Sequence, residues 1–345
     1  MGLRFGIFDS FDLSHDTPGA VLRERLAFAQ EAERLGFEHY HVTEHHGTPL
    51  SVSPSPNVFL AALSQRTTTM RFGALVYVLP GYDPFRLAEE IATLDQLSGG
   101  RLDFGVGSGI SPIELGYLGV DAAQARPIFQ ETLDAVTTAL RTGRMADRDA
   151  TLSVRPYQEP YPELWYASGS ASTADWAGAN AVHLVSRWEG GAIAEVAPTY
   201  WTAWEKHRAD PDRLNPNVDV PRLGISGPVV IGESEEQALD LFHSTNALHE
   251  QRLMHLWHEH DDRRLDGMFS ADRILANGNA IVGTAGSVRD AVVAQVETSG
   301  INYLELRLIY GDMGLARATT IAREFMTHVA PAAREAAATR SEFPS

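Results

Sequence analysis

Short β-rich segments alternate with longer amphipathic segments along the whole chain, and this alternation restricts the possible folds more than any other feature. The predicted strands cover residues 3–10, 39–45, 70–80, 101–109, 163–169, 181–186, 222–232 and 301–309. The predicted helices cover residues 18–36, 57–67, 83–100, 123–143, 170–179, 192–208, 234–253 and 315–332. Strands that alternate with helices form a parallel sheet. Eight such units favour a closed α/β barrel, the TIM (β/α)8 barrel, over an open sheet.

The 345 residues could hold two domains by length alone. However, no glycine- and serine-rich linker and no change of composition divides the chain, so we predict a single domain over residues 1–345. Two insertions interrupt the pattern. Residues 144–163 are expected to hold extra strands, and residues 258–286 form a long, polar and charged stretch. A loop of that kind in a compact barrel is typically a mobile lid over the active site.

Composition narrows the classes of function. The net charge of −17 argues against a nucleic-acid or anionic-membrane binder, because both need a basic surface. The absence of cysteine excludes disulfides, thiolate metal sites, iron–sulfur clusters and cysteine nucleophiles. The N-terminus lacks the features of a signal peptide, and no apolar run approaches the ~18 residues of a membrane span. We therefore expect a soluble cytoplasmic protein.

Glu44, His45 and His46 stand together where the second predicted strand ends. In a barrel, chemistry takes place at the carboxyl ends of the strands. Side chains alternate in direction along a strand, so Glu44 and His46 should share one direction and His45 the other. Three adjacent residues of a strand do not easily converge on one metal ion, and the HExxH spacing is absent, so no metal site is predicted. Proton transfer, substrate hydrogen bonding and an ordinary polar loop remain the alternatives.

The sequence GVGSG follows the fourth predicted strand at residues 105–109. It does not match the dinucleotide fingerprint G-x-G-x-x-G, because Ile110 occupies the position of the last glycine. What remains is a glycine-rich strand end where the backbone can approach a ligand closely.

Small hydroxylated residues follow the fifth predicted strand and begin the next helix, in the segment Ser168–Thr173. Ser170, Ser172 and Thr173 surround the free backbone N–H groups at the positive end of that helix, an arrangement that binds phosphate. The alternative is an ordinary helix N-cap, for which one serine is sufficient. Three hydroxyl groups within four residues favour phosphate binding.

Four motifs, in the same order along the chain, resemble the bacterial luciferase-like family of flavin-dependent monooxygenases. They are EHHG at residues 44–47, PGYDPFRLAEEIATLDQLSGGRLDFGVGSG at 80–109, SASTADWA at 170–177 and VGTAGSVRDAVVAQVETSGINYLEL at 282–306. The second is the most specific, because a long string matches in register. The resemblance covers nearly the whole chain and implies a TIM barrel that binds reduced FMN at its mouth.

The resemblance also implies roles for individual residues. A non-proline cis peptide that lies against the flavin maps to Leu75–Val76. His45 matches the family's catalytic histidine, which assists in forming, protonating or breaking down the flavin C4a-hydroperoxide, and His46 is expected to support or orient it. The phosphate-binding turn of the luciferase α subunit maps to four positions: Ser168, Gly169, Ser170 and Thr173.

This chain departs from the luciferase pattern at two places. Gly107 and Ser108 stand where luciferase has a cysteine and a phosphate-binding arginine, and Gly169 replaces a glutamate. Gly107 and Ser108 are still expected to border the flavin. With that arginine missing, Ser170 and Thr173 should matter more for holding the phosphate. The departures also count against light emission.

The predicted function is that of a flavin-dependent monooxygenase. Reduced FMN, supplied by a separate flavin reductase, would react with O2, and one oxygen atom would pass to a small organic substrate. One alternative keeps the barrel but uses coenzyme F420 for hydride transfer, and another is a non-catalytic flavin-binding protein. Family habit implies a homodimer.

Overall fold

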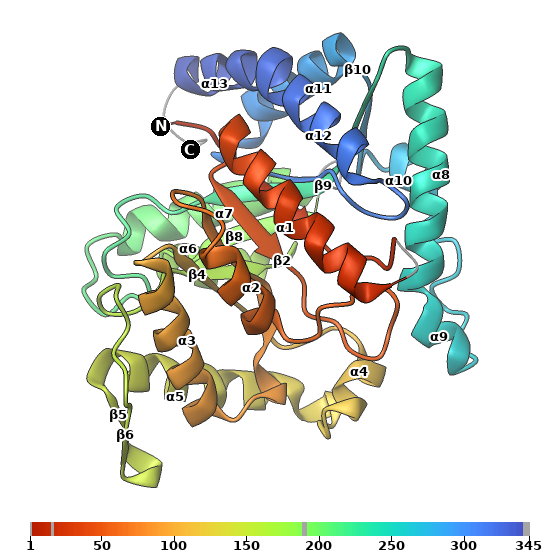
Figure 1. The fold of residues 1–345 in the computed structure, drawn as a ribbon. Coiled ribbons are helices and arrows are strands. Elements are labelled where there is room, and N and C mark those ends of the chain that lie inside the picture. The colour runs from red at the N-terminus through yellow and green to blue at the C-terminus, as the bar shows by residue number, and fades with distance from the viewer. Residues whose placement is uncertain (1, 15–16, 188–191, 341–345) are drawn as a thin grey trace.

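The computed structural model describes residues 2–14, 17–187 and 192–340. Its centre is a closed barrel of parallel strands surrounded by helices (Figure 1). The strands are β1 (Arg4–Asp9), β2 (His39–Val42), β3 (Arg71–Val78), β4 (Leu102–Gly107), β5 (Arg144–Met145), β6 (Ala150–Thr151), β7 (Leu164–Ala167), β8 (His183–Arg187), β9 (Leu223–Gly232), β10 (Ile281–Thr284) and β11 (Tyr303–Arg307). The order β11-β1-β2-β3-β4-β7-β8-β9 closes on itself, because β9 pairs with both β8 and β11. The predicted TIM barrel and its eight strands are confirmed.

Helices follow most of the barrel strands and cover the outside of the barrel. The α-helices are α1 (Pro18–Leu35), α2 (Pro56–Ser64), α3 (Pro84–Ser98), α4 (Pro112–Tyr117), α5 (Ala125–Thr142), α6 (Ala171–Ala179), α7 (Ala192–His207), α8 (Glu235–Leu253), α9 (His255–Glu259), α10 (Ala271–Ala276), α11 (Ala285–Ser299), α12 (Leu315–Glu324) and α13 (Ala330–Thr339). Short helices of other types are η1 (Leu79–Gly81), η2 (Ala122–Gln124), η3 (Ala146–Arg148) and the π-helical η4 (Phe325–Val329).

Local signals in the sequence fix the ends of several helices. Asp83 caps α3 by accepting a hydrogen bond from the backbone N–H of Arg86, and Pro84 occupies the first helical position. Gly36 ends α1 with a φ of 93°, a left-handed conformation that costs glycine little. Between these helices and the barrel lies one large cluster of buried apolar side chains. The helices, with their capped ends, and the apolar core therefore hold the strand ends in place.

The two insertions differ in structure. Residues 144–163 contain the predicted extra strands, since β5 and β6 pair antiparallel and form a hairpin that projects from the barrel (Figure 1). Residues 258–286 contain the end of α9, all of α10 and β10, and the start of α11. Strand β10 was not predicted, and it pairs in parallel with Val229–Gly232 of β9. The lid remains a prediction, and it now concerns the part of the insertion before β10.

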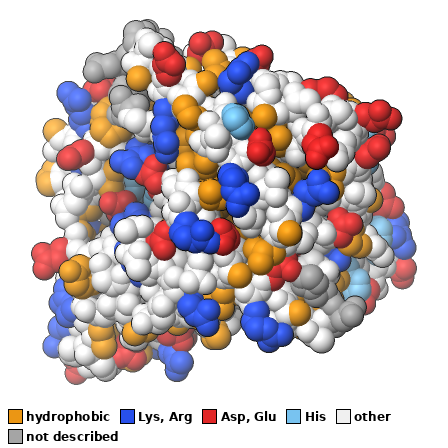
Figure 2. Space-filling view, turned by 45° about the horizontal axis from the view of Figure 1, so that its top comes forward, with side chains coloured by type: hydrophobic (Ala, Val, Ile, Leu, Met, Phe, Trp, Pro, Cys, Tyr) orange, Lys and Arg blue, Asp and Glu red, His pale blue; other side chains and the backbone are white. Residues whose placement is uncertain are grey.

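The surface carries both signs of charge. Acidic and basic side chains are interspersed over the face shown in Figure 2. Among the described residues, no helix has the length and apolar character that crossing a membrane requires.

A layer of buried charged and polar side chains fills the barrel below its mouth. The carboxylate of Asp103 lies 2.7 Å from Nδ1 of His39, 3.1 Å from Nε2 of His41 and 2.7 Å from Nε of Arg71. The other ring nitrogen of His41 is hydrogen-bonded to Glu305. His39, His41 and Asp103 are residue types that bind metals, and their ligand atoms lie within 4.8 Å of one another. Here each of them is part of a hydrogen-bonded network that also includes an arginine.

Burial and charge shift the two histidine pKa values in opposite directions. Burial lowers the pKa of His39 to about 4, more than Asp103 can raise it. For His41, burial also favours the neutral ring, but Glu305 and Asp103 outweigh it and raise the pKa to about 9. His41 is therefore protonated at neutral pH and His39 is neutral.

These shifts predict a bell-shaped dependence of stability on pH. From an unfolded pKa of 6.5 down to about 4, the unfolded state binds a proton at His39 that the folded state does not, so stability falls with falling pH. From 6.5 up to about 9, the folded state keeps a proton at His41 that the unfolded state loses, so stability falls with rising pH. We expect calorimetric unfolding to take up protons near pH 5 and release them near pH 8. Stability that rises steadily between pH 6.5 and 9 would contradict this account.

Candidate functional site

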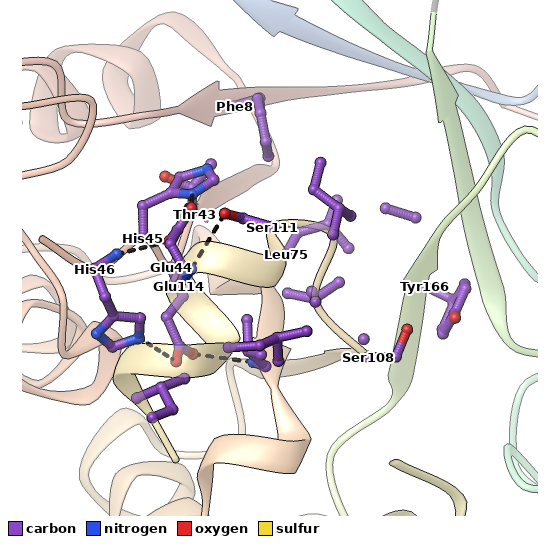
Figure 3. Close-up of a pocket in the computed structure, with 18 residues that line it drawn as sticks. Phe8, Thr43, Glu44, His45, His46, Leu75, Ser108, Ser111, Glu114 and Tyr166 are labelled. Carbon is purple, nitrogen blue, oxygen red and sulfur yellow. Dashed lines mark hydrogen bonds and ion pairs between the residues drawn. The ribbon is translucent and has the colours of Figure 1, made fainter. Parts of the chain in front are cut away.

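A cavity of about 230 Å³ opens at the carboxyl ends of the barrel strands. Its lining comes from the ends of β1, β2, β3, β4 and β7 and from α4, as Figure 3 shows. Six predicted site residues line it: His45, His46, Leu75, Val76, Gly107 and Ser108. The lining also includes Ala167, directly before the predicted phosphate-binding turn. Ser168, Gly169, Ser170 and Thr173 therefore begin where the cavity ends.

Glu44 and His46 form a hydrogen-bonded pair in the segment that follows β2, which ends at Val42. Oε1 of Glu44 lies 2.9 Å from Nε2 of His46 (Figure 3). Oε2 of Glu44 accepts hydrogen bonds from the backbone N–H of Val78 at 3.1 Å and from the hydroxyl of Tyr82 at 2.8 Å. Glu44 is therefore a buried anchor between the second and third strand ends, and it orients His46.

His45 has a different carboxylate partner, Glu114 of α4. Nδ1 of His45 lies 3.1 Å from Oε1 of Glu114, and the backbone N–H of His46 donates to Oε2 at 2.7 Å. Within the described chain, Nε2 of His45 and Nδ1 of His46 have no hydrogen-bond partner. Each imidazole is thus held at one nitrogen by a carboxylate, and its other nitrogen remains available.

Sequence reasoning missed Glu114, although a signal for its position exists. The segment Ser111–Glu114 has the Ser-x-x-Glu spacing of a capping box. Ser111 does cap α4, accepting a hydrogen bond from the backbone N–H of Glu114 at 3.2 Å. The Glu114 side chain, however, binds the two histidines instead of closing the box.

The carboxylates change the acid–base properties of the site. The hydrogen bond to the carboxylate of Glu44, opposed by partial burial, raises the pKa of His46 above its ordinary value. Burial alone would raise the pKa of Glu114, but its hydrogen bond and charge interaction with His45 lower it overall. The cavity therefore contains an anchored carboxylate beside an imidazole that titrates above its usual range. This combination suits proton transfer near neutral pH.

The part of the lining that comes from β3 and β4 contains close backbone contacts. The peptide bond between Leu75 and Val76 is cis, as the family resemblance implies. A Cβ atom at Gly107 would lie 2.4 Å from Cγ2 of Val76, so any side chain at 107 would displace Val76. Gly109 has a φ of 80°, a conformation that L-amino acids with side chains rarely adopt. The glycines of this strand end thus serve close packing and a backbone turn.

The segment Ser168–Thr173 is exposed and caps its own helix. Oγ of Ser170 accepts a hydrogen bond from the backbone N–H of Thr173 at 3.3 Å and lies 2.8 Å from the Thr173 hydroxyl. Ser170 is therefore the N-cap of α6, as the alternative interpretation stated. In the described part of the chain, the N–H groups of Ala171 and Ser172 have no acceptor, as is usual for the first turn of a helix. Capping and anion binding are compatible here.

A cation that the sequence did not reveal contacts Tyr166, two residues before this turn. Arg126, in the first turn of α5, donates from Nη1 to the hydroxyl of Tyr166 at 3.1 Å. Tyr166 lines the cavity, and its ring packs edge-on against Trp176 of α6 at 5.5 Å. Arg126 is thus a cation in contact with a residue of the cavity lining.

The insertion before β10 reaches the same site. Nε2 of His260 lies 3.1 Å from the hydroxyl of Tyr117 at the end of α4. Two other residues of α4 or its C-terminus, Leu115 and Leu118, line the cavity. The predicted lid thus contacts the helix that carries Glu114.

Comparison with known proteins agrees with this geometry. Residues 3–303 match the family described as luciferase-like monooxygenase. The uncharacterized protein y4wF of Sinorhizobium fredii is 32% identical over 339 residues, which cover 95% of this chain and 97% of that protein. The 4-hydroxyprotoasukamycin monooxygenase of Streptomyces nodosus subsp. asukaensis is 32% identical over 254 residues, covering 69% and 67%.

Solved structures share the fold at lower identity. The oxygenating constituent of 3,6-diketocamphane monooxygenase from Pseudomonas putida, solved in complex with FMN, has a TM-score of 0.78 at 18% identity and covers 96% of this chain and 98% of its own. An F420-dependent secondary alcohol dehydrogenase has a TM-score of 0.71 at 18% identity, covering 97% and 100%. The sequence match over most of the chain, together with the closed barrel, places this protein in the luciferase-like monooxygenase family.

Proposed function

We propose that this protein is a flavin-dependent monooxygenase that uses reduced FMN and O2 to oxygenate a small organic substrate, with a separate reductase supplying the reduced flavin. One observation carries the proposal. Two carboxylate-held imidazoles and the Leu75–Val76 peptide line one cavity, and its lining runs up to Ala167, directly before a hydroxyl-rich helix start. A flavin ring would need the cavity and a ribityl phosphate would need the helix start.

The dimensions of the site support a ligand that extends out of the cavity. The cavity of about 230 Å³ is smaller than the ~300–1,000 Å³ usual for cofactor pockets. It would hold the ring between the histidine side and the Leu75–Val76 side. The phosphate would lie outside, at Ser170, Thr173 and Arg126.

When bound, reduced flavin supplies the reaction with O2 that oxygen transfer requires. The chain's own residues supply positioning and proton transfer. His45 offers its free Nε2 as the proton-transfer atom, while Glu114 fixes the orientation of the ring through Nδ1. His46, held by Glu44, supports the same wall. Apolar side chains such as Leu75 and Leu115 limit the access of water to the site.

The proposed phosphate site makes a testable prediction. The double variant Ser170→Ala, Thr173→Ala and the single variant Arg126→Gln should each weaken FMN binding about ten-fold or more, since charge-assisted hydrogen bonds are lost. Riboflavin, which lacks the phosphate, should bind almost as well as before. Fluorescence titration with both ligands makes the comparison. Removing Ser170 also removes a helix cap, but a disturbed helix would weaken both ligands equally. Equal losses would put the phosphate elsewhere.

A second prediction concerns the proposed lid. Arg263 and Arg264 are exposed, so trypsin should cut there early in flavin-free protein and more slowly when flavin and substrate are bound. Arg144, in the exposed β5–β6 hairpin, provides the internal control, because its cleavage should not respond to ligand. Protection of residues 260–270 from the start would identify this segment as a fixed insertion.

Oxygen uptake tests the proposed function against its alternatives. A monooxygenase given reduced FMN and substrate consumes O2 and forms oxygenated product. An enzyme that transfers hydride from reduced F420 needs no oxygen, and a non-catalytic flavin-binding protein turns over with neither. Turnover with reduced F420 under anaerobic conditions, and none with reduced FMN in air, would overturn the proposal.

A further inference from the structure

Arg307 lies at the barrel mouth but belongs to neither the histidine wall nor the phosphate turn. It is the last residue of β11, and it shares a strand direction with Tyr303 and Glu305. Glu305 points into the barrel, where it meets His41. Arg307 therefore points inward one layer higher, at the floor of the mouth. Tyr303 and Glu305 are fully buried, whereas Arg307 is partly exposed.

One edge of the Arg307 guanidinium is fixed by the protein. Its Nη1 lies 3.0 Å from Nε2 of His249, and Nδ1 of His249 lies 2.6 Å from Oδ2 of Asp12. Because arginine can only donate, His249 accepts through Nε2 and donates to Asp12 through Nδ1–H. Asp12 is also held by the backbone N–H of Gly311 at 3.0 Å. This chain of hydrogen bonds sets the orientation of the guanidinium.

The other edge of the guanidinium has no partner in the part of the chain that the structure describes. Among the described residues, no acceptor is found for its buried Nε or for Nη2, and no carboxylate lies within ion-pair distance of Arg307. Nε and Nη2 form the edge that matches the two oxygens of a carboxylate. A buried cationic donor without a partner is unfavourable, so this edge is suited to a ligand.

The guanidinium of Arg307 lies over the ring of a residue that lines the cavity. The guanidinium carbon of Arg307 lies 5.5 Å from the centroid of the Phe8 ring. Phe8 lines the cavity, and Figure 3 shows its ring at one side of the site. A group bound to the free edge would therefore lie next to the space proposed for flavin and substrate.

The position of β11 separates this cation from the phosphate turn. In the closed order of eight strands, β11 is four strands from β4 and three from β7. Arg307 thus lies across the mouth from Gly107 and away from Ser168–Thr173. A phosphate held at that turn would not occupy Arg307.

We propose that the free Nε–Nη2 edge of Arg307 binds a carboxylate of the organic substrate, so that the protein acts on small organic acids. That this acid is a substrate rests on the proposed monooxygenase function. The binding of a carboxylate at Arg307 does not itself require flavin.

Calorimetric titration of the flavin-free protein tests this site directly. The probes are acetate, hexanoate and benzoate, each compared with its uncharged amide. We expect at least one acid to bind and its amide to bind much more weakly. Arg307→Gln should weaken acid binding about ten-fold or more. Arg307→Lys should weaken it less, because lysine keeps the positive charge but lacks the two parallel N–H donors of the guanidinium. Arg86→Gln, which removes an exposed arginine of α3, should bind like the parent.

The controls separate this inference from the proposed function. Arg307→Gln should keep the parent's circular dichroism and FMN affinity, which would show that the fold and the flavin site are intact. If the parent binds none of the three acids, or binds acids and amides alike, the carboxylate site is wrong even where FMN binds. If an acid binds through Arg307 but FMN does not bind, the carboxylate site stands and the flavin-dependent function fails.

Discussion

His45→Ala is expected to slow product formation by roughly 10²–10⁴-fold, the usual contribution of a positioned acid–base group. The fold and the affinity for reduced FMN should change little, because His45 is partly exposed and its hydrogen bond is to a side chain of the neighbouring α4. Without the proton-transfer group, oxygen should be diverted to H2O2. The measurement is the fraction of consumed O2 that appears in product, compared with the fraction that appears as H2O2.

Two further variants make this result specific. His46→Ala should have a smaller effect, because Glu44 ties His46 into the wall between the second and third strands. Glu114→Gln should lower the rate partially, since an amide can still hold the His45 ring but carries no charge. If His45→Ala couples oxygen to product as well as the parent while His46→Ala does not, the catalytic imidazole is His46. If neither matters, both histidines are polar rim residues.

Asp103→Ala should lower the free energy of unfolding by about 3–5 kcal/mol, the cost usual for removing one partner of a buried charge pair. Asp103 is fully buried and is the shared acceptor for Arg71, His39 and His41. Its removal leaves two cations, Arg71 and protonated His41, without the carboxylate that they share. Chemical denaturation at pH 7 measures the loss.

A matched surface variant provides the comparison for Asp103. Asp149 is also paired with an arginine, Arg144, at 2.8 Å, but its side chain is 92% exposed. Asp149→Asn should therefore have little effect, since solvent screens exposed pairs and asparagine tolerates the left-handed backbone of residue 149, with a φ of 47°. If the two substitutions lower the free energy of unfolding by the same amount, the charge network does not stabilise the barrel interior.

The arrangement of the barrel follows from the sequence because its signals are local and repeated. Strands such as β4 are buried on both faces, and capping residues such as Asp83 and Gly36 fix the ends of helices. Strand β10 could not be found this way. Its four residues lie within a polar stretch, and they become a strand only because the far end of β9 extends beyond the barrel to pair with them.

Residues of the cavity lining could be predicted from the sequence where they follow directly from the position of a strand end. His45 and His46 could be located because they follow a strand end, and six of the ten predicted site residues border one cavity. The partners could not be predicted, because Glu114 is 69 residues from His45 and Arg126 is 40 residues from Tyr166. Only the closed barrel brings those segments together. The role of Gly107 was likewise hidden, since its close neighbour is Val76 of the adjacent strand.

Anaerobic titration of the protein with reduced FMN, followed by rapid mixing with oxygenated buffer, tests directly whether this barrel mouth brings a reduced flavin to oxygen. We expect saturable binding of reduced FMN. On mixing, the absorbance of a transient intermediate should appear before that of oxidised FMN. The time course of this absorbance should be altered in His45→Ala. Reduced FMN that fails to bind, or that oxidises in one phase at the rate of free FMN, would contradict a flavin-dependent monooxygenase.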